Sequence, residues 1–120
     1  MAEHNELGKK GEEIAVGFLR TNGFIILETN WRFGNKEVDI IARKDKLLVV
    51  AEVKTRSGNY MGDPEVFVTR EKQKFIIRAA NAYVTKKNLD VEVRFDIISI
   101  IVNGPGHTIK HIEDAFYPTL

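Results

Sequence analysis

The most constraining feature of the chain is an apolar segment, Leu47–Ala51, that leads directly into Glu52-Val53-Lys54. Side chains alternate between the two faces of a β-strand, so Glu52 and Lys54 are expected to point the same way as Val50. A charged side chain in an otherwise buried strand is costly unless it is paired or bound to a metal. The segment therefore predicts either a local Glu52–Lys54 ion pair at a strand end or a functional site.

Length and composition narrow the class of protein. A chain of 120 residues is expected to form one domain, residues 1–120, with a core of its own. The absence of cysteine excludes disulfides and thiolate metal sites, and it favours a reducing compartment. No apolar run approaches the ~20 residues of a membrane helix, and the N-terminus lacks the pattern of a signal peptide, so we expect a cytoplasmic protein that is not membrane-bound. A net charge of +1 neither favours nor excludes nucleic acid.

Hydrophobic periodicity predicts the order of the elements. Helical spacing indicates a helix over 7–21, ended by Asn22-Gly23, and a second helix from a Thr69 cap to about Lys86. Apolar and turn patterns predict a loop at 57–64 and strands at 24–31, 37–42, 47–54, 91–102 and 107–112. A three-residue polar turn at 44–46 makes the strands that flank it antiparallel. The order predicts an α/β fold with a central mixed sheet and helices against it.

Three acids and one lysine can form a hydrolytic site. Phosphodiester hydrolysis at neutral pH needs an activated water and compensation for developing charge, and Mg²⁺ held by carboxylates provides both. Asp39 and Glu52, expected on adjacent strands, can converge on one such ion, with the Val53 carbonyl as a further oxygen ligand. Lys54 can orient the attacking water or offset the transition-state charge, and Glu12 can extend the acidic cluster from the first helix. From the residues alone, a nuclease-type site and a structural ion pair remain equally open.

The chain resembles a known family in several blocks. Gly8-x-x-Gly11-Glu12-x-x-Ala15, Glu37–Ala42 and Val50–Arg56 are similar to signature blocks of the YraN family of predicted endonucleases, as are the later segments 68–74 and 94–96. The resemblance implies the restriction-endonuclease-like, PD-(D/E)XK fold and a similarity to Holliday-junction resolvases. It implies that Asp39, Glu52 and Lys54 form the catalytic triad, that Glu12 is an extra acid, and that Mg²⁺ or Mn²⁺ is required. Related resolvases act as dimers, so a homodimer is compatible with the resemblance.

Basic side chains are candidates for contacts with nucleic acid. Arg56 follows the triad, and Lys36 stands where relatives usually carry glycine. Arg70, Lys74 and Arg78 form one stripe along the second helix, beside Gln73. Each can equally be a solvated surface residue, whereas Asp96 is expected to be structural and paired with a nearby cation. The sequence thus predicts a metal-dependent endonuclease that acts on DNA, with branched or structured DNA as a candidate substrate. The alternative is a non-catalytic nucleic-acid-binding protein that retains a nuclease fold.

Overall fold

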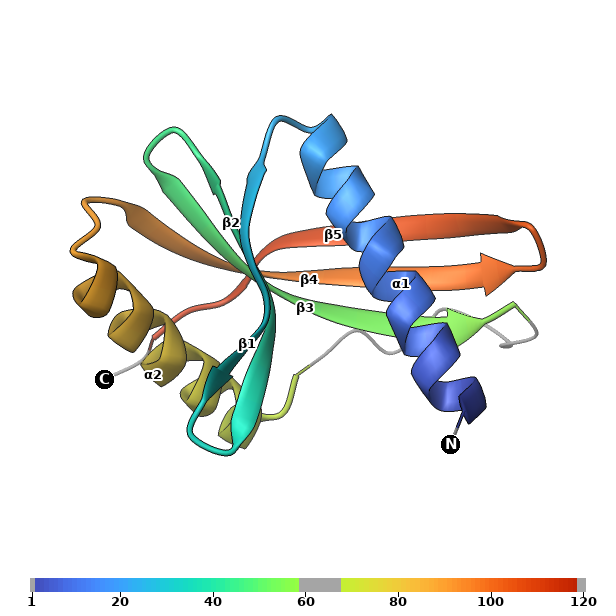
Figure 1. Ribbon diagram of the computed structural model, residues 1–120, viewed down its shortest axis with the longest axis horizontal. Coiled ribbons are helices and arrows are strands. Elements are labelled where there is room, and N and C mark those ends of the chain that lie inside the picture. Colours follow the sequence, from blue (N-terminus) through green and yellow to red (C-terminus); the bar gives the residue numbers. More distant parts are fainter. Residues whose placement is uncertain (1, 59–67, 119–120) are drawn as a thin grey trace.

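A computed structural model describes residues 2–58 and 68–118 and confirms the predicted α/β fold, which is compatible with a restriction-endonuclease-like fold. Figure 1 shows a strongly twisted sheet with two helices packed against it. The order is one helix, three strands, a second helix and two further strands, as predicted. The elements are α1 (Ala2–Thr21), β1 (Ile25–Phe33), β2 (Lys36–Lys44), β3 (Leu47–Ser57), α2 (Arg70–Lys87), β4 (Glu92–Asn103) and β5 (Gly106–Phe116).

The sheet is mixed, and its five strands lie in sequence order. Strand β2 pairs antiparallel with both β1 and β3, and β4 pairs antiparallel with β5. Strands β3 and β4 are parallel, because the connection that contains α2 returns the chain to the same end of the sheet. The short turn after β2 therefore gives the predicted antiparallel pair, and β3 lies in the centre.

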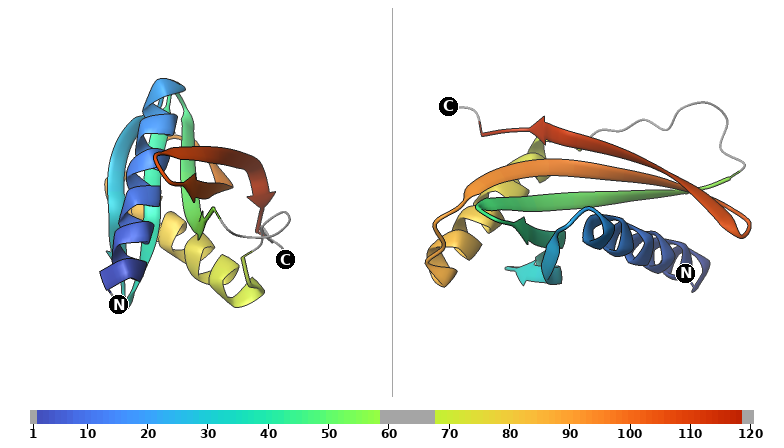
Figure 2. Two further views of the ribbon diagram at one scale, coloured as in Figure 1. Left: turned by 90° about the vertical axis from the view of Figure 1, so that its right-hand side faces the viewer. Right: turned by 90° about the horizontal axis from the view of Figure 1, so that it is seen from above.

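The two helices bury opposite faces of this sheet. Leu19 of α1 belongs to one apolar cluster with Val49 of β3, whereas Ile76 of α2 belongs to a second cluster with Val50. Every residue from Leu48 to Glu52 is consequently buried, as the continuous apolar run predicts. Figure 2 shows the sheet edge-on, with α1 lying along it.

The element boundaries differ from the predicted ones in a few places. Helix α1 begins at Ala2 rather than at residue 7, because no helix-breaking residue stands between them. Thr69 is the predicted N-cap of α2, and its hydroxyl accepts from the amide of Lys72 at 3.2 Å. Beyond Gly58, the predicted loop at 57–64 lies outside the described residues. Within the described ranges, neither helix has the length and apolar character that crossing a bilayer requires.

Candidate active site

Asp39 and Glu52 lie side by side where β2 and β3 stop pairing. The backbone ladder between these strands runs from Lys44–Leu47 to Ile40–Ala51 and ends there. Beyond it, the amide of Val53 donates to Oδ2 of Asp39 at 2.8 Å, and the amide of Asp39 donates to Oε2 of Glu52 at 3.5 Å. Two carboxylates thus take the place of backbone acceptors. The sequence pattern predicted both strands and their antiparallel pairing, which brings the two acids together.

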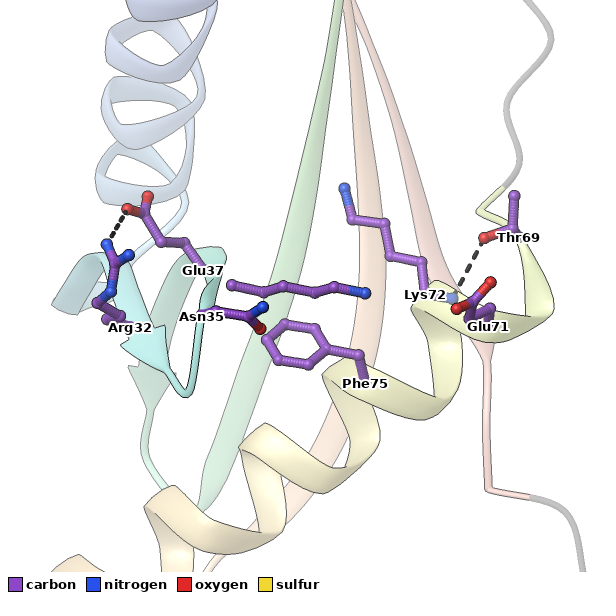
Figure 3. Close-up of a pocket in the computed structure, with 8 residues that line it drawn as sticks. Arg32, Asn35, Glu37, Thr69, Glu71, Lys72 and Phe75 are labelled. Carbon is purple, nitrogen blue, oxygen red and sulfur yellow. Dashed lines mark hydrogen bonds and ion pairs between the residues drawn. The ribbon is translucent and has the colours of Figure 1, made fainter.

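The partner of Glu52 is Lys72, so the prediction of a local Glu52–Lys54 ion pair is wrong. The Glu52 side chain is 2% exposed, and its Oε1 lies 2.7 Å from Nζ of Lys72, which is itself half-exposed. Figure 3 shows Lys72 leaving the first turn of α2 and extending toward the sheet. Helical spacing could have revealed this residue, because Lys72 precedes Ile76 by four positions and therefore shares its buried stripe.

Glu12 approaches the same region from α1. Its half-buried side chain accepts a hydrogen bond from Nδ2 of Asn30 at 2.6 Å. Together with Asp39 it lines a cavity of about 260 Å³, whose other walls are Leu7, Gly8, Val53 and Thr55. Helix α1 approaches β3 closely at Gly11, where an added methyl group would collide with the Thr55 hydroxyl. That contact fixes the distance between α1 and β3 beside the acids.

All three acids have raised pKa values. Burial raises the pKa of Asp39, and this effect outweighs the hydrogen bond from Val53 and the charges of Lys72 and Lys54. For Glu52, burial and then the charge of Asp39 raise the pKa against the opposing effect of Lys72. The pKa of Glu12 is raised by burial and next by Asp39. Burial is the largest cause for each of the three acids, so the folded chain disfavours their ionised forms.

Lys54 is half-buried on β3, two residues beyond Glu52. By strand alternation it projects from the same face as Glu52. Its positive charge lowers the pKa of Asp39, although not enough to reverse the effect of burial. Lys54 is thus an electrostatic neighbour of Asp39, whereas Lys72 is the direct ionic partner of Glu52.

The oxygen donors of this region suit a hard divalent cation. Asp39 and Glu52 supply carboxylates, and Val53 and Glu12 could add a carbonyl and a further carboxylate. Mg²⁺ commonly takes only one or two protein carboxylates and completes its coordination with water and substrate phosphate. Among the residues that the structure describes, no three His, Cys, Asp or Glu side chains group as a self-contained metal site. A cation at these acids would therefore need further ligands from water or substrate, and the Mg²⁺ or Mn²⁺ requirement stays a prediction.

The predicted nucleic-acid contacts lie in different places around this region. Lys36 lies in a hollow of about 530 Å³ between the β1–β2 turn and α2, and its Nζ is 5.7 Å from the centre of the Phe75 ring. Lys72 lines the same hollow. Arg56 is exposed and donates to the carbonyl of Thr55 at 3.1 Å.

The remaining predicted contacts lie on α2. Arg70, Lys74 and Arg78 are exposed, so the predicted stripe exists, but it lies on the side of the helix turned away from the sheet. The Gln73 amide donates to the carbonyl of Val68 at 2.8 Å, immediately before the helix. Gln73 therefore stabilises the entry to α2, which carries Lys72.

Comparison with known proteins places the chain in a family. Residues 11–100 match the model of the family described as "Uncharacterised protein family UPF0102". A UPF0102 protein of Christiangramia forsetii is 55% identical, with 98% of both chains covered. Another of Bacteroides thetaiotaomicron is 50% identical over 100% of this chain and 99% of the relative. These matches confirm the resemblance drawn from the motifs, since UPF0102 is the YraN family. The chain belongs to the UPF0102 family.

Proposed function

We propose that this protein is a metal-dependent endonuclease that hydrolyses phosphodiester bonds in DNA, with branched or otherwise structured DNA as its candidate substrate. The supporting observation is the pair of half-buried Asp39 and buried Glu52, each of which accepts from a backbone amide at the point where β2 and β3 separate. Burial raises the pKa values of both acids, so a positive charge bound beside them would stabilise their ionised forms. A divalent cation would supply that charge and would serve phosphodiester hydrolysis.

The residues of the site have distinct roles in this proposal. Asp39 and Glu52, with the Val53 carbonyl and Glu12, would hold Mg²⁺ or Mn²⁺. Such a cation polarises the phosphate and lowers the pKa of a bound water. Lys54 offsets charge that develops on the phosphate oxygens in the transition state. The ion pair of Lys72 with the buried Glu52, at 2.7 Å, opposes the effect of burial on the pKa of Glu52 and so favours the ionised form that can act as a ligand.

Basic side chains around the site support a polyanionic substrate. Lys36 and Arg32 line the hollow next to Lys72, and Arg56 is exposed at the end of β3. Arg32 is already paired with Glu37 at 3.4 Å, so Lys36 and Arg56 are the stronger candidates for phosphate contacts. Contacts of this kind position the backbone of DNA and carry no sequence information.

The test is cleavage of labelled four-way junction, flap and linear duplex DNA in Mg²⁺, Mn²⁺ or chelator. We expect metal-dependent cleavage by the parent protein and none by Glu52→Gln, which keeps the shape of the side chain but loses its charge. Glu13→Gln is the matched control, because Glu13 is an exposed neighbour of Glu12 on α1. Equal cleavage by Glu52→Gln would contradict the proposal. Retention of DNA without cleavage in any metal would favour the non-catalytic binding protein.

A further inference from the structure

A second basic surface lies on the outer side of α2, away from the acids. A hollow of about 520 Å³ separates this helix from the chain segment that follows β5. In Figure 1, the described segment that follows β5 lies beside α2. We call this hollow the α2–Tyr117 groove, and its lining residues are Arg70, Gln73, Lys74, Ile77, Arg78, Tyr117 and Pro118.

The α2–Tyr117 groove carries three positive charges. Arg70, Lys74 and Arg78 follow one another at four-residue spacing, so their charges repel along one face of the helix. Within residues 2–58 and 68–118, no acidic side chain forms an ion pair with any of the three. An array of this kind weakens its own helix and is complementary to a chain of phosphates.

Tyr117 presents an aromatic ring at the edge of the same groove. It is 66% exposed, and it is the one aromatic residue among the large exposed hydrophobic side chains of the described residues. Its neighbour Phe116 is buried and stacks on Phe95, with ring centroids 5.2 Å apart. The backbone is therefore anchored immediately before Tyr117, while the Tyr117 ring itself remains available to solvent.

The groove also connects with the candidate active site around α2. Lys74 and Arg78 line a second hollow, of about 360 Å³, on the opposite flank of the helix. That hollow shares Lys36 and Phe75 with the hollow that contains Lys72. A path of basic side chains thus runs from the partner of Glu52 over α2 to Tyr117.

We propose that the α2–Tyr117 groove binds an unpaired segment of DNA. Arg70, Lys74 and Arg78 contact its phosphates, and Tyr117 stacks on a base. Single-strand sites combine these two elements, because every base offers an aromatic face whereas a base inside a duplex does not. The inference deepens the proposed nuclease function and rests on it. The site would favour DNA in which an unpaired arm adjoins the duplex that is cut.

Binding in chelator tests the groove separately from cleavage. Fluorescence anisotropy would compare a labelled single strand of about ten nucleotides with a blunt duplex, using Glu52→Gln protein so that no cleavage interferes. We expect Tyr117→Ala to weaken single-strand binding about fivefold or more, which is the lower range of base–aromatic stacking, and to leave duplex binding unchanged. Tyr117→Phe keeps the ring and should restore the affinity.

The salt dependence of single-strand binding tests the basic side chains of the groove separately from Tyr117. Arg78→Gln should reduce the slope of log affinity against log salt by about 0.7 for the single strand. Lys86→Gln, which removes one exposed charge near the end of the same helix, should leave the slope unchanged. Single-strand binding that is insensitive to Tyr117→Ala would overturn the inference. So would tighter, Tyr117-dependent binding of the matched RNA. The nuclease proposal fails on a different result, namely the absence of metal-dependent cleavage in the parent protein.

Discussion

Acids in two regions of the same sheet have pKa values shifted in opposite directions. Asp96 of β4 is fully buried, yet its pKa is lowered: burial would raise it, but hydrogen bonds from His111 and Arg94 outweigh burial. Arg94 donates to both carboxylate oxygens at 2.9 Å, His111 Nε2 lies 2.7 Å away, and the amide of Asp114 donates at 3.0 Å. For Asp39 and Glu52, burial prevails and the pKa values are raised.

The difference separates a structural acid from a candidate functional one. The carboxylate of Asp96 receives donors from three residues on its own and the neighbouring strand, so the folded chain completes its environment. Asp39 and Glu52 repel each other, and their lysines compensate them only in part. An acid whose ionised form is disfavoured by burial is a candidate for binding a ligand. The site at β2 and β3 is supported by this shift together with the hydrogen bonds that hold Asp39 and Glu52 side by side.

The largest expected effect is a difference in the free energy of unfolding between the variants Asp96→Asn and Asp39→Asn. Asp96→Asn should lower the free energy of unfolding by about 3 kcal/mol, because it removes the buried charge that Arg94 and His111 contact and leaves Arg94 only its pair with the exposed Glu113. Asp39→Asn should change it by less than about 1 kcal/mol or raise it, since it removes a charge that the fold disfavours. Urea denaturation at neutral pH measures both. Equal losses would remove the distinction between the two regions.

The same pair of variants should differ in pH dependence. A lowered pKa in the folded state stabilises the protein above the unfolded value near 3.8, and this contribution is lost as the pH falls through the folded pKa. The parent's advantage over Asp96→Asn should therefore shrink in acid. A raised pKa has the opposite sign: ionised Asp39 costs stability at neutral pH, and the cost disappears as the pH falls through its folded pKa. Parallel pH profiles for the two variants would contradict these directions.

Lys54→Ala tests which lysine serves the reaction. We expect single-turnover cleavage to fall about 100-fold or more, as when one group that stabilises transition-state charge is removed. Stability should change little, because the direct partner of Glu52 is Lys72. A large loss of stability with unchanged cleavage per folded molecule would reverse the roles assigned to the two lysines.

Lys72→Met tests the ion pair itself. It leaves the carboxylate of Glu52 buried and unpaired, so the metal-free protein should lose about 2 kcal/mol, less than for a fully buried pair because Lys72 is half-exposed. Adding Glu52→Gln should recover most of that loss, since no buried charge then remains. Lys74→Met is the control from the exposed side of α2 and should have little effect. Additive losses in the double variant would show that the pair is not coupled.

The strands of the sheet and the positions of Asp39 and Glu52 on them could be predicted from the sequence, because strands follow from short-range apolar periodicity and turns. The apolar run at Leu47–Ala51 indicated the central strand, and the turn at 44–46 made its neighbour antiparallel, which brings Asp39 next to Glu52. The expected cation partner of Asp96 proved to be Arg94, two residues away on the same strand.

The ionic partner of Glu52 required the tertiary structure. Strand spacing alone could not identify this partner, because Glu52 and Lys54 share a face just as Arg94 and Asp96 do, and only the second of these couples forms an ion pair at 2.9 Å. Lys72 reaches Glu52 only because α2 docks against the sheet. The packing of Gly11 on Thr55 likewise depends on where α1 crosses β3. Distances between a helix and a sheet are set by the whole core and not by the pattern of one element.

The proposal that Asp39 and Glu52 hold a cation is tested most directly by calorimetric titration with Mn²⁺. We expect the parent protein and the Glu13→Gln control to bind Mn²⁺ and to unfold at a higher temperature in its presence, because a ligand of the folded state stabilises it. Asp39→Asn and Glu52→Gln should lose both the binding heat and the stabilisation. No binding by the parent, or undiminished binding by Asp39→Asn, would contradict the proposal that these acids hold a cation.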